Sequence, residues 1–157
     1  MHYWLMKSEP DVFSIDHLRA RANRTEHWDG VRNFQARNFM RAMKVGDRAF
    51  FYHSSCPEPG IAGIIEIVRA AQPDRTSWDP KSEYYDPRSA PEKPYWYMVD
   101  VRFERKLARL VPLAELRANR ALKNMRLLAR GNRLSIMPVT EREWSEILKM
   151  EPTPVAR

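Results

Sequence analysis

The stretch YWYMVDVRFE, from Tyr95 to Glu104, carries the clearest fold signal in the chain. Tyr97, Val99, Val101 and Phe103 alternate with Met98, Asp100, Arg102 and Glu104. An alternation with a period of two residues is typical of a β-strand that packs one face against a core. The stretch therefore predicts a strand with one buried face.

Four further segments on either side of this strand have the composition of strands. They are Tyr3–Lys7, Arg48–Ser54, Ile61–Arg69 and Leu134–Val139. Ile61–Arg69 is apolar nearly throughout, which suggests burial on both faces. Because no regular strand–helix alternation connects the segments, we expect an α+β domain with about five strands in a small, curved, mostly antiparallel sheet or barrel.

Helix signals fall between and after these strands. Ser14 is a candidate cap for a short helix that reaches about Arg21, and Asn33 for a helix that reaches about Met43. Pro112–Ala118 is predicted as a short helix. Thr140 and Glu143 form a capping box for a last helix, whose Trp144 we expect in the core. We expect the domain to span residues 1–150 and residues 151–157 to be a flexible tail.

The segment Gln72–Pro94 is rich in proline and poor in aliphatic residues, and it is predicted as a long loop. Loops of this length in a compact domain are usually functional or disordered. This loop contains Trp78, Tyr84 and Tyr85, and aromatic residues argue against disorder.

The charge of the chain favours a polyanionic partner. Its 157 residues, enough for one domain, include 27 Lys and Arg against 20 Asp and Glu, a net charge of +7. Arg117–Arg133 holds six positive charges and no acidic residue. On its own, such a run is more often a solvated helix face than a binding site.

The single cysteine, Cys56, excludes an internal disulfide and a cysteine-rich zinc site. The N-terminal residues lack the features of a signal peptide, and the longest apolar runs, such as Ile61–Ile65, are too short to span a bilayer. We therefore expect a soluble, cytoplasmic protein with no membrane partner.

Catalytic and cofactor signatures are weak in this chain. The four histidines show no metal-ligand spacing, and the five glycines do not form a phosphate-binding loop, so we predict no metal and no cofactor. His53-Ser54-Ser55-Cys56 sets a base beside nucleophiles, but neighbours in a strand point to opposite faces. Asp79, Glu83 and Asp86 share the loop with Lys81 and Arg88 and are as well explained by pairing with them.

Trp28 and Asn33 suggest a different chemistry. In WDGVRNFQARN, Trp28–Asn38, the indole lies between polar residues, before a glycine and a predicted helix start. The ring either fills the core or lines a pocket. An aromatic wall beside an amide and unpaired helix N–H groups is what a planar heterocycle with polar edges requires.

Seven stretches of the chain together resemble the EVE domain, whose eukaryotic form is the thymocyte nuclear protein family. They are YWLMKSEP (3–10), WDGVRNFQARNFM (28–40), FFYHSS (50–55), PGIAGIIEIV (59–68), DPKSEYYDPRS (79–89), WYMVDVRF (96–103) and GNRLSIMPV (131–139). They follow one another in sequence order, and the resemblance extends over nearly the whole chain, about residues 2–149, which makes it specific. It implies a PUA-like pseudo-barrel with flanking helices, related to the YTH readers of methylated adenine. It also implies a non-enzymatic reader of a modified base, with 5-methylcytosine or another modified cytosine in DNA as the leading ligand and RNA left open.

The resemblance further implies a base-binding pocket, an aromatic cage for a flipped base. Its residues would be Lys7, Ser8, Glu9, Trp28, Gly30, Val31, Arg32, Asn33, Tyr52, His53, Ser54, Tyr84, Tyr85, Asp86, Pro87, Leu134, Ser135, Met137 and Pro138. Trp28 would stack on the base, and Asn33 and Ser8 would contact its polar edge.

Six basic residues are expected to bind phosphates and to supply affinity that does not depend on the modification. They are Arg37, Arg41, Lys44, Arg126, Arg130 and Arg133. The expected partner is DNA or RNA, and the expected oligomeric state is a monomer. Two alternatives stay open: an enzyme that processes nucleic acids or nucleotides, and a regulatory module that binds a small molecule such as a nucleoside in the same pocket.

Overall fold

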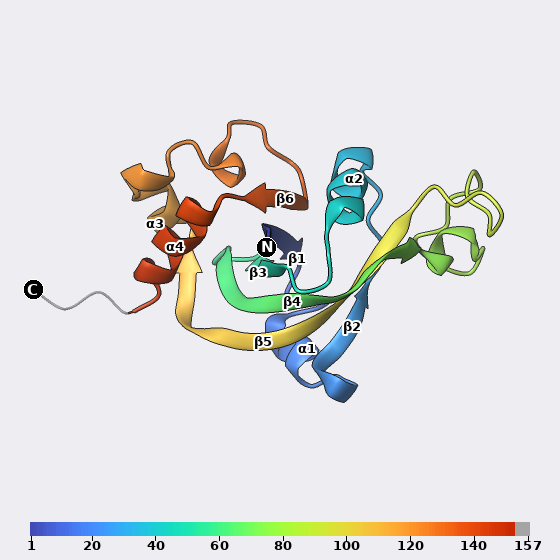
Figure 1. Cartoon of the computed structure of the whole chain (residues 1–157), viewed down its shortest axis with the longest axis horizontal. Coiled ribbons are helices and arrows are strands. Elements are labelled where there is room, and N and C mark those ends of the chain that lie inside the picture. Colours follow the sequence, from blue (N-terminus) through green and yellow to red (C-terminus); the bar gives the residue numbers. More distant parts are fainter. Residues whose placement is uncertain (153–157) are drawn as a thin grey trace, which may run out of the picture.

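Six strands form one mixed sheet in the computed structural model, which describes residues 1–152 (Figure 1). Their order across the sheet is β2-β5-β4-β3-β1-β6. The strands are β1 (Tyr3–Ser8), β2 (Thr25–Trp28), β3 (Arg48–His53), β4 (Gly60–Pro73), β5 (Tyr97–Pro112) and β6 (Ile136–Val139). The α+β class predicted from the sequence is confirmed.

Four α-helices accompany the sheet: α1 (Ile15–Arg19), α2 (Phe34–Ala42), α3 (Leu113–Ala118) and α4 (Glu141–Met150). The predicted caps are present. Ser14 and Thr140 each form a capping box, and the Asn33 side chain accepts a hydrogen bond from the Ala36 N–H at 2.9 Å. A 3₁₀ turn, Arg75–Trp78, lies in the long loop.

Strand pairing explains the curvature of the sheet. β1 pairs with β3 in parallel, and every other named pair is antiparallel. The register between β4 and β5 shifts at several points, and such bulges bend a strand and increase its twist. Both strands are therefore long and strongly curved, and the loop between them projects beyond the sheet (Figure 1).

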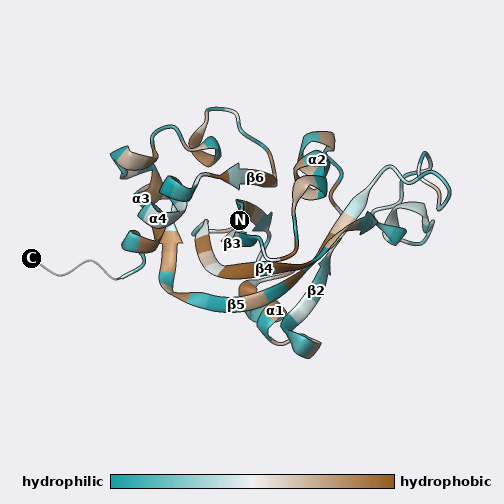
Figure 2. Cartoon of the chain, in the orientation of Figure 1, coloured by the Kyte–Doolittle hydropathy of each residue, from teal (hydrophilic) through white to brown (hydrophobic). Residues whose placement is uncertain are grey.

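The sheet separates two hydrophobic clusters, as the period of a strand requires. Met6 of β1 and Phe51 of β3 belong to one cluster, which α1 and α2 cover. Leu5 and Phe50, their neighbours in sequence, belong to the other cluster, which α3 and α4 cover. Hydrophobic residues are therefore concentrated in the strands of the sheet, while the loop that projects between β4 and β5 is mainly hydrophilic (Figure 2).

The structure differs from the sequence predictions in three places. Thr25–Trp28 is a sixth strand that was not predicted, and it pairs with β5 from Thr25↔Arg102 to Trp28↔Val99. β4 and β5 extend further than expected, to Pro73 and Pro112. In the predicted tail, the carboxylate of Glu151 accepts hydrogen bonds from Arg105, and residues 153–157 lie outside the described residues.

Candidate functional site

A cavity of about 840 Å³ opens at one edge of the sheet. Its volume lies within the range typical of small-molecule sites, roughly 300–1,000 Å³. Segments far apart in the sequence form its wall. The lining residues are Lys7, Ser8, Glu9, Val12, Phe13, Arg21, Glu26, His27, Trp28, Asp29, Gly30, Val31, Arg32, Asn33, Ser54, Ser55, Tyr84, Arg133 and Ser135.

The parallel pairing of β1 with β3 builds one side of the cavity. Because the strands run in the same direction, both end at the same edge of the sheet, and Ser8 lies opposite His53. The Ser54 N–H donates to the carbonyl of Ser8 at 2.9 Å, and the Lys7 N–H donates to the carbonyl of Ser135 at 2.8 Å. Backbone hydrogen bonds thus fix three of the lining segments to each other.

Trp28 forms part of both the core and the cavity wall. Its indole makes edge contacts with Phe51, at 5.5 Å between ring centroids, and with Phe13, at 6.4 Å. Only 7% of the residue is exposed, yet it lines the cavity. Both alternatives that the sequence left open are therefore partly correct. The contacts with the two phenylalanines hold the indole in a fixed orientation.

Gly30 allows the loop before β5 to close over the cavity. Its φ is +78°, in the left-handed region that side chains other than glycine rarely adopt. A Cβ at this position would lie 2.7 Å from the ring of Tyr84. Only glycine therefore permits both the turn after Trp28 and the close approach of Tyr84.

Arg32 connects the segment after β2 to the projecting loop. Its guanidinium donates to the carboxylate of Asp74 at 3.1 Å and to the carbonyl of Tyr84 at 2.8 Å. Asp74 is fully buried and also accepts the Gly30 N–H at 2.9 Å. Arg32, predicted as part of the pocket wall, does line the cavity, but its guanidinium is occupied by the loop that carries Tyr84, and we assign Arg32 a positioning role.

Asn33 presents a polar group to the cavity. Its Oδ1 caps α2 by accepting a hydrogen bond from the Ala36 N–H, so this oxygen is already occupied. Among residues 1–152, its Nδ2 has no hydrogen-bond acceptor. This amide nitrogen can therefore donate to the acceptor edge of a ligand.

Burial disfavours charge in the cavity. It lowers the pKa of the Lys7 ammonium. It also raises the pKa of the Asp29 carboxyl, and the nearby carboxylates of Asp74 and Glu26 raise it further. Both shifts favour the neutral forms of these two groups, while Arg21, Glu26 and Arg133 add charged side chains to the same wall.

Eight of the predicted pocket residues do not line the cavity. Tyr52 and Met137 lie in the cluster on the opposite face of the sheet, and Leu134 packs against that cluster. Pro138 pairs with Trp4 within the sheet. The His53 ring accepts the Ile15 N–H at 3.2 Å, and burial lowers its pKa. The Tyr52 prediction is wrong because successive residues of a strand point to opposite faces of the sheet. Its neighbour Phe51 lies on the face that packs against Trp28, so Tyr52 lies on the other face.

The other three, Tyr85, Asp86 and Pro87, border a second hollow of about 290 Å³. There the Arg88 guanidinium and the Trp96 Nε1–H, both donating hydrogen bonds, hold the pKa of Asp86 well below its usual range. Arg32 and Tyr84 line both hollows, so the two are adjacent.

The predicted phosphate-binding residues are spread over several elements. Arg133 lines the cavity. Arg37, Arg41 and Arg126 lie over aromatic rings, with the Arg41 guanidinium 4.5 Å from the Tyr97 ring centroid. Lys44 and Arg130 are exposed.

Seven residues that line the cavity were not predicted: Val12, Phe13, Arg21, Glu26, His27, Asp29 and Ser55. His27 and Asp29 are the sequence neighbours of Trp28, so their position beside a predicted pocket residue is a signal by which the sequence could have identified them. The His27 Nδ1 lies 2.6 Å from the carboxylate of Asp100 on β5. Arg21 pairs with Glu26 at 2.8 Å, a contact that depends on the unpredicted strand β2. Cys56 follows Ser55 at this edge and is partly exposed.

The loop carboxylates considered for catalysis do not assemble into a cluster. Asp86 pairs with Arg88 at 2.8 Å, and Asp79 accepts the Lys81 N–H. Within residues 1–152, no group of three or more His, Cys, Asp and Glu side chains is arranged to hold a metal ion. In the same part of the chain, no helix has the length and hydrophobicity to span a membrane.

Comparison with known proteins gives concordant matches. The profile of the EVE domain family matches residues 2–150. Human thymocyte nuclear protein 1 is 50% identical over 166 residues, which cover 95% of this chain and 73% of that protein. A crystal structure of human THYN1 protein in complex with 5-methylcytosine-containing DNA has a TM-score of 0.94 at 48% identity, and covers 99% of this chain and 100% of that one. A Pseudomonas syringae protein, PSPTO5229, has a TM-score of 0.91 at 50% identity, with 96% and 99% of the two chains covered.

Proposed function

The chain belongs to the EVE domain family, and from this premise we propose that it is a non-enzymatic module that binds nucleic acid and reads a modified base, with modified cytosine in DNA as the leading ligand. A base flipped out of its strand would enter the cavity beside Trp28. The observation that carries the proposal is this cavity, in a chain whose relative THYN1 forms a complex with 5-methylcytosine-containing DNA.

The cavity chemistry supports a flipped base as ligand. A base is flat, neutral and polar at its edge, and enzymes and readers that extrude bases hold them by stacking and by edge hydrogen bonds. Trp28, which lines the cavity, offers an aromatic wall, and the Asn33 Nδ2 offers a donor.

The methyl group adds a limited preference. Burial of one methyl or methylene contributes about 0.8 kcal/mol, which corresponds to roughly a fourfold difference in affinity. Val31 and Phe13 supply apolar surface in the cavity. A preference well above fourfold would require the wall to fit the modified base in shape as well.

A binding screen tests the proposal. Short DNA and RNA oligonucleotides with one cytosine, 5-methylcytosine, adenine or N6-methyladenine are titrated with the protein, and affinity and strand integrity are measured together. We expect saturable binding that favours one modified base by about fourfold or more, with intact strands. Cleavage or base release would support the enzyme alternative, and binding of free nucleosides alone would support the small-molecule alternative.

Trp28→Leu tests the place of binding. It removes the ring but keeps apolar bulk in the core, so that the folded state can be assayed below its lowered melting temperature. We expect the preference for the modified base to disappear while the salt-dependent background affinity remains. If the preference persists in the folded variant, the base does not bind beside Trp28.

A further inference from the structure

An exposed aromatic residue lies beside the cavity, and the proposed function leaves it without a role. Phe34 is the first residue of α2, directly after Asn33, and 47% of it is exposed. Its ring stacks on Trp96 at 4.7 Å between centroids, with an interplanar angle of 23°. Trp96 is fully buried and holds the phenyl ring from below, so the exposed ring has a rigid support.

Arginines surround this ring. The Arg37 guanidinium lies 4.8 Å from the Phe34 centroid, and the Arg88 guanidinium lies 5.8 Å from it. Arg88 is paired with Asp86. The Arg37 guanidinium donates to the carbonyl of Tyr95 and to the Asn38 Oδ1, and in the described part of the chain no carboxylate lies within 4.0 Å of it. We call Phe34, Arg37 and Arg88 the Phe34 platform.

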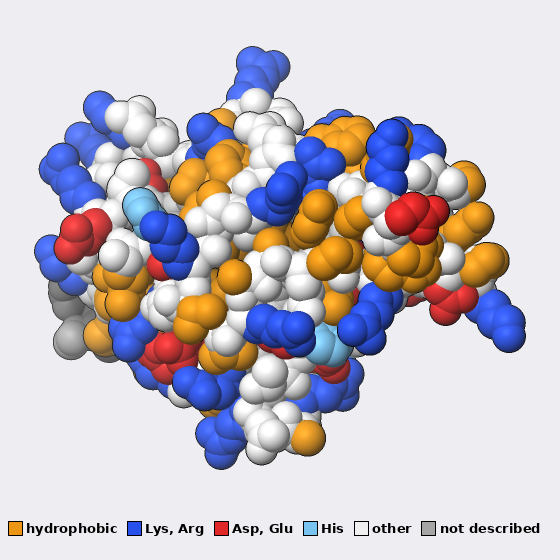
Figure 3. All heavy atoms as spheres, turned by 45° about the vertical axis from the view of Figure 1, so that its right-hand side comes forward, with side chains coloured by type: hydrophobic (Ala, Val, Ile, Leu, Met, Phe, Trp, Pro, Cys, Tyr) orange, Lys and Arg blue, Asp and Glu red, His pale blue; other side chains and the backbone are white. Residues whose placement is uncertain are grey.

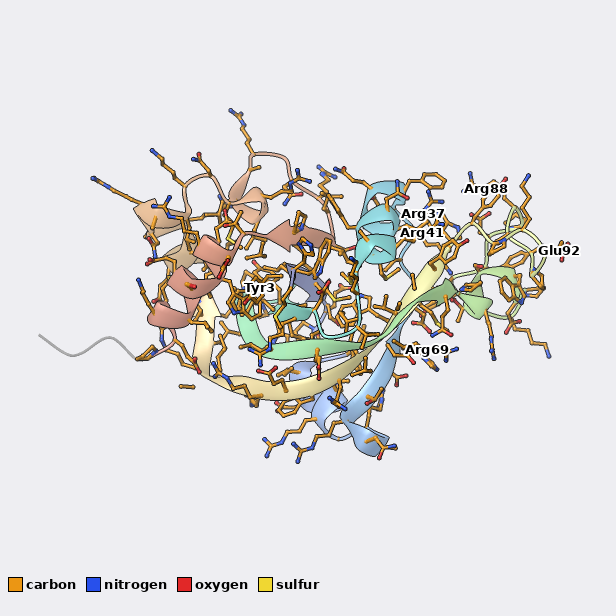
Figure 4. All side chains as sticks on the ribbon, in the orientation of Figure 1. Tyr3, Arg37, Arg41, Arg69, Arg88 and Glu92 are labelled. Carbon is orange, nitrogen blue, oxygen red and sulfur yellow. The ribbon has the colours of Figure 1, made fainter. Side chains whose placement is uncertain are left out.

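The platform faces outward, at the junction of α2 with the projecting loop. Arg37 and Arg88 lie on the same side of the molecule, and Arg41 of α2 continues the basic surface (Figure 4). In the space-filling view that brings this side forward, hydrophobic side chains alternate with Lys and Arg (Figure 3). Aromatic rings and guanidinium planes within a positive surface are the features that bind unpaired bases of a single strand.

The platform and the cavity are continuous. Asn33 lines the cavity and is bonded to Phe34, while Arg32 and Tyr84 line both the cavity and the hollow beside Trp96. Phe34 itself lines neither hollow, but it follows Asn33 in the chain and stacks on Trp96 of the second hollow, so a nucleotide next to one in the cavity would have the Phe34 ring within reach. The positive charge around Phe34 and the position of the platform next to the cavity both favour a nucleotide of the same strand as the group that binds to the platform.

We propose that the Phe34 platform stacks the base next to the one in the cavity, so that the protein holds two consecutive unstacked nucleotides of one strand. This inference rests on the proposed function but concerns a separate surface. It makes the flanking base, as well as the modified one, a determinant of affinity. Because every base has a π face, the platform tolerates any flanking sequence.

Abasic probes test the platform without any mutation. A single-stranded heptamer with a central 5-methylcytosine is compared with heptamers that carry an abasic residue on its 5′ or 3′ side, and with 5-methyl-2′-deoxycytidine alone. Stacking of one base on an aromatic side chain corresponds to roughly a 5- to 150-fold change in affinity. We expect one of the two abasic heptamers, and not the other, to bind more weakly by a factor in this range.

Phe34→Ala should cause the same loss on the intact heptamer and no further loss on the abasic heptamer that already binds weakly. Its affinity for the nucleoside should stay within about twofold of wild type. Phe34→Tyr keeps the ring and should restore binding. Val45→Ala truncates another exposed hydrophobic residue, 64% exposed and away from Trp96, and should change nothing.

The outcomes separate the two proposals. If wild type binds the nucleoside or the heptamer and both abasic heptamers bind as well as the intact one, the platform is wrong and the cavity stands. If Phe34→Ala weakens nucleoside binding as much as heptamer binding, Phe34 only supports the cavity wall and the platform is again wrong. If wild type binds none of the probes, 5-methylcytosine in a single strand is not the ligand, and the platform proposal fails with it.

Discussion

Gly30 is the residue on which the shape of the cavity most directly depends. It combines a φ of +78° with a close approach to the Tyr84 ring, and these are two separate requirements. A side chain at this position would strain the backbone and push against an aromatic ring that the loop holds in place. Stability and binding therefore respond to this residue through different causes.

Gly30→Ala should lower the free energy of unfolding by about 1–3 kcal/mol and weaken oligonucleotide binding, because the new Cβ displaces Tyr84. Chemical denaturation and a binding titration measure the two effects. Gly46→Ala is the matched control, since its φ is +97° and nothing lies within 4 Å of its Cβ position. It should lose similar stability and keep full affinity. Equal affinities for the two variants would show that Tyr84 does not shape the site.

At the scale of single residues, sequence patterns led to the cavity but not to all of its wall. Trp28, Gly30 and Asn33 were identified from a polar context, a turn and a helix cap, all of which are local features. Tyr52 was misplaced because a matching motif does not state which face of a strand each residue occupies. Phe13 was missed because it reaches the cavity only through the packing of its ring against Phe51 and Trp28.

At the scale of elements, the loop between β4 and β5 is ordered by polar contacts rather than by an apolar core. Asp74 accepts hydrogen bonds from Gly30, Arg32 and Thr76, and Ser77 lies 2.8 Å from Ser89 across the loop. Removal of one partner from a buried ion pair is costly because the other charge remains without compensation. The Asp74 contacts therefore determine the position of Tyr84.

Asp74→Asn should destabilise the protein by about 3–5 kcal/mol and accelerate amide hydrogen exchange in residues 77–89. The cause is the loss of the carboxylate that neutralises the half-buried Arg32. Hydrogen–deuterium exchange with mass spectrometry measures the local effect. Asp79→Asn, on an exposed carboxylate of the same loop, is the control and should leave exchange nearly unchanged. Similar exchange in both variants would refute the role of Asp74.

The elements themselves were predictable where one face is buried and the other is not. β5 and α4 were recognised from their periodicity and caps. β2 was missed because Thr25–Trp28 is short and mostly polar, and it becomes a strand only by pairing with β5. The ends of β4 and β5 were missed for a related reason: the apolar run that predicts β4 stops before Arg69, and bulges interrupt the alternation that predicts β5.

For the molecule as a whole, charge and pH should act through different groups. The excess of positive charge acts at long range on a polyanion, whereas a few buried or paired carboxylates determine acid stability. Each effect can be measured without the other.

The double variant Arg126→Ala with Arg130→Ala should weaken modified and unmodified oligonucleotides equally. If both side chains contact phosphates, the slope of log K against log salt concentration should fall in magnitude by about 2. Binding titrations at several salt concentrations measure this slope. Arg142→Ala with Lys149→Ala removes the same charge from α4, and should leave a slope close to that of wild type. A loss confined to the modified strand would contradict phosphate binding by Arg126 and Arg130.

Acid should destabilise the fold below about pH 4. Hydrogen bonds from Arg88, Arg109 and Arg105 lower the pKa of Asp86, Glu115 and Glu151 respectively. For Asp47, burial opposes ionisation, but N–H donors from Lys44, Trp4 and His2 lower the pKa overall. Carboxyls with lowered folded-state pKa values stabilise the protein above their unfolded values, near 4, and this stability is lost as the pH falls through the folded values.

Thermal unfolding from pH 7 to pH 2 measures this loss. Asp47→Asn should lower the melting temperature at pH 7 and show a smaller further decrease below pH 4 than wild type. If the variant and wild type lose stability in parallel with acid, Asp47 does not contribute to the pH dependence.

The chain's only thiol, at Cys56, follows a serine of the cavity wall and is partly accessible to solvent. A maleimide dye would therefore attach at one defined position, without any engineered cysteine, next to the wall of the cavity. Changes in its emission would report occupancy in real time, and the labelled protein would serve as an optical sensor for screening chemically altered oligonucleotides.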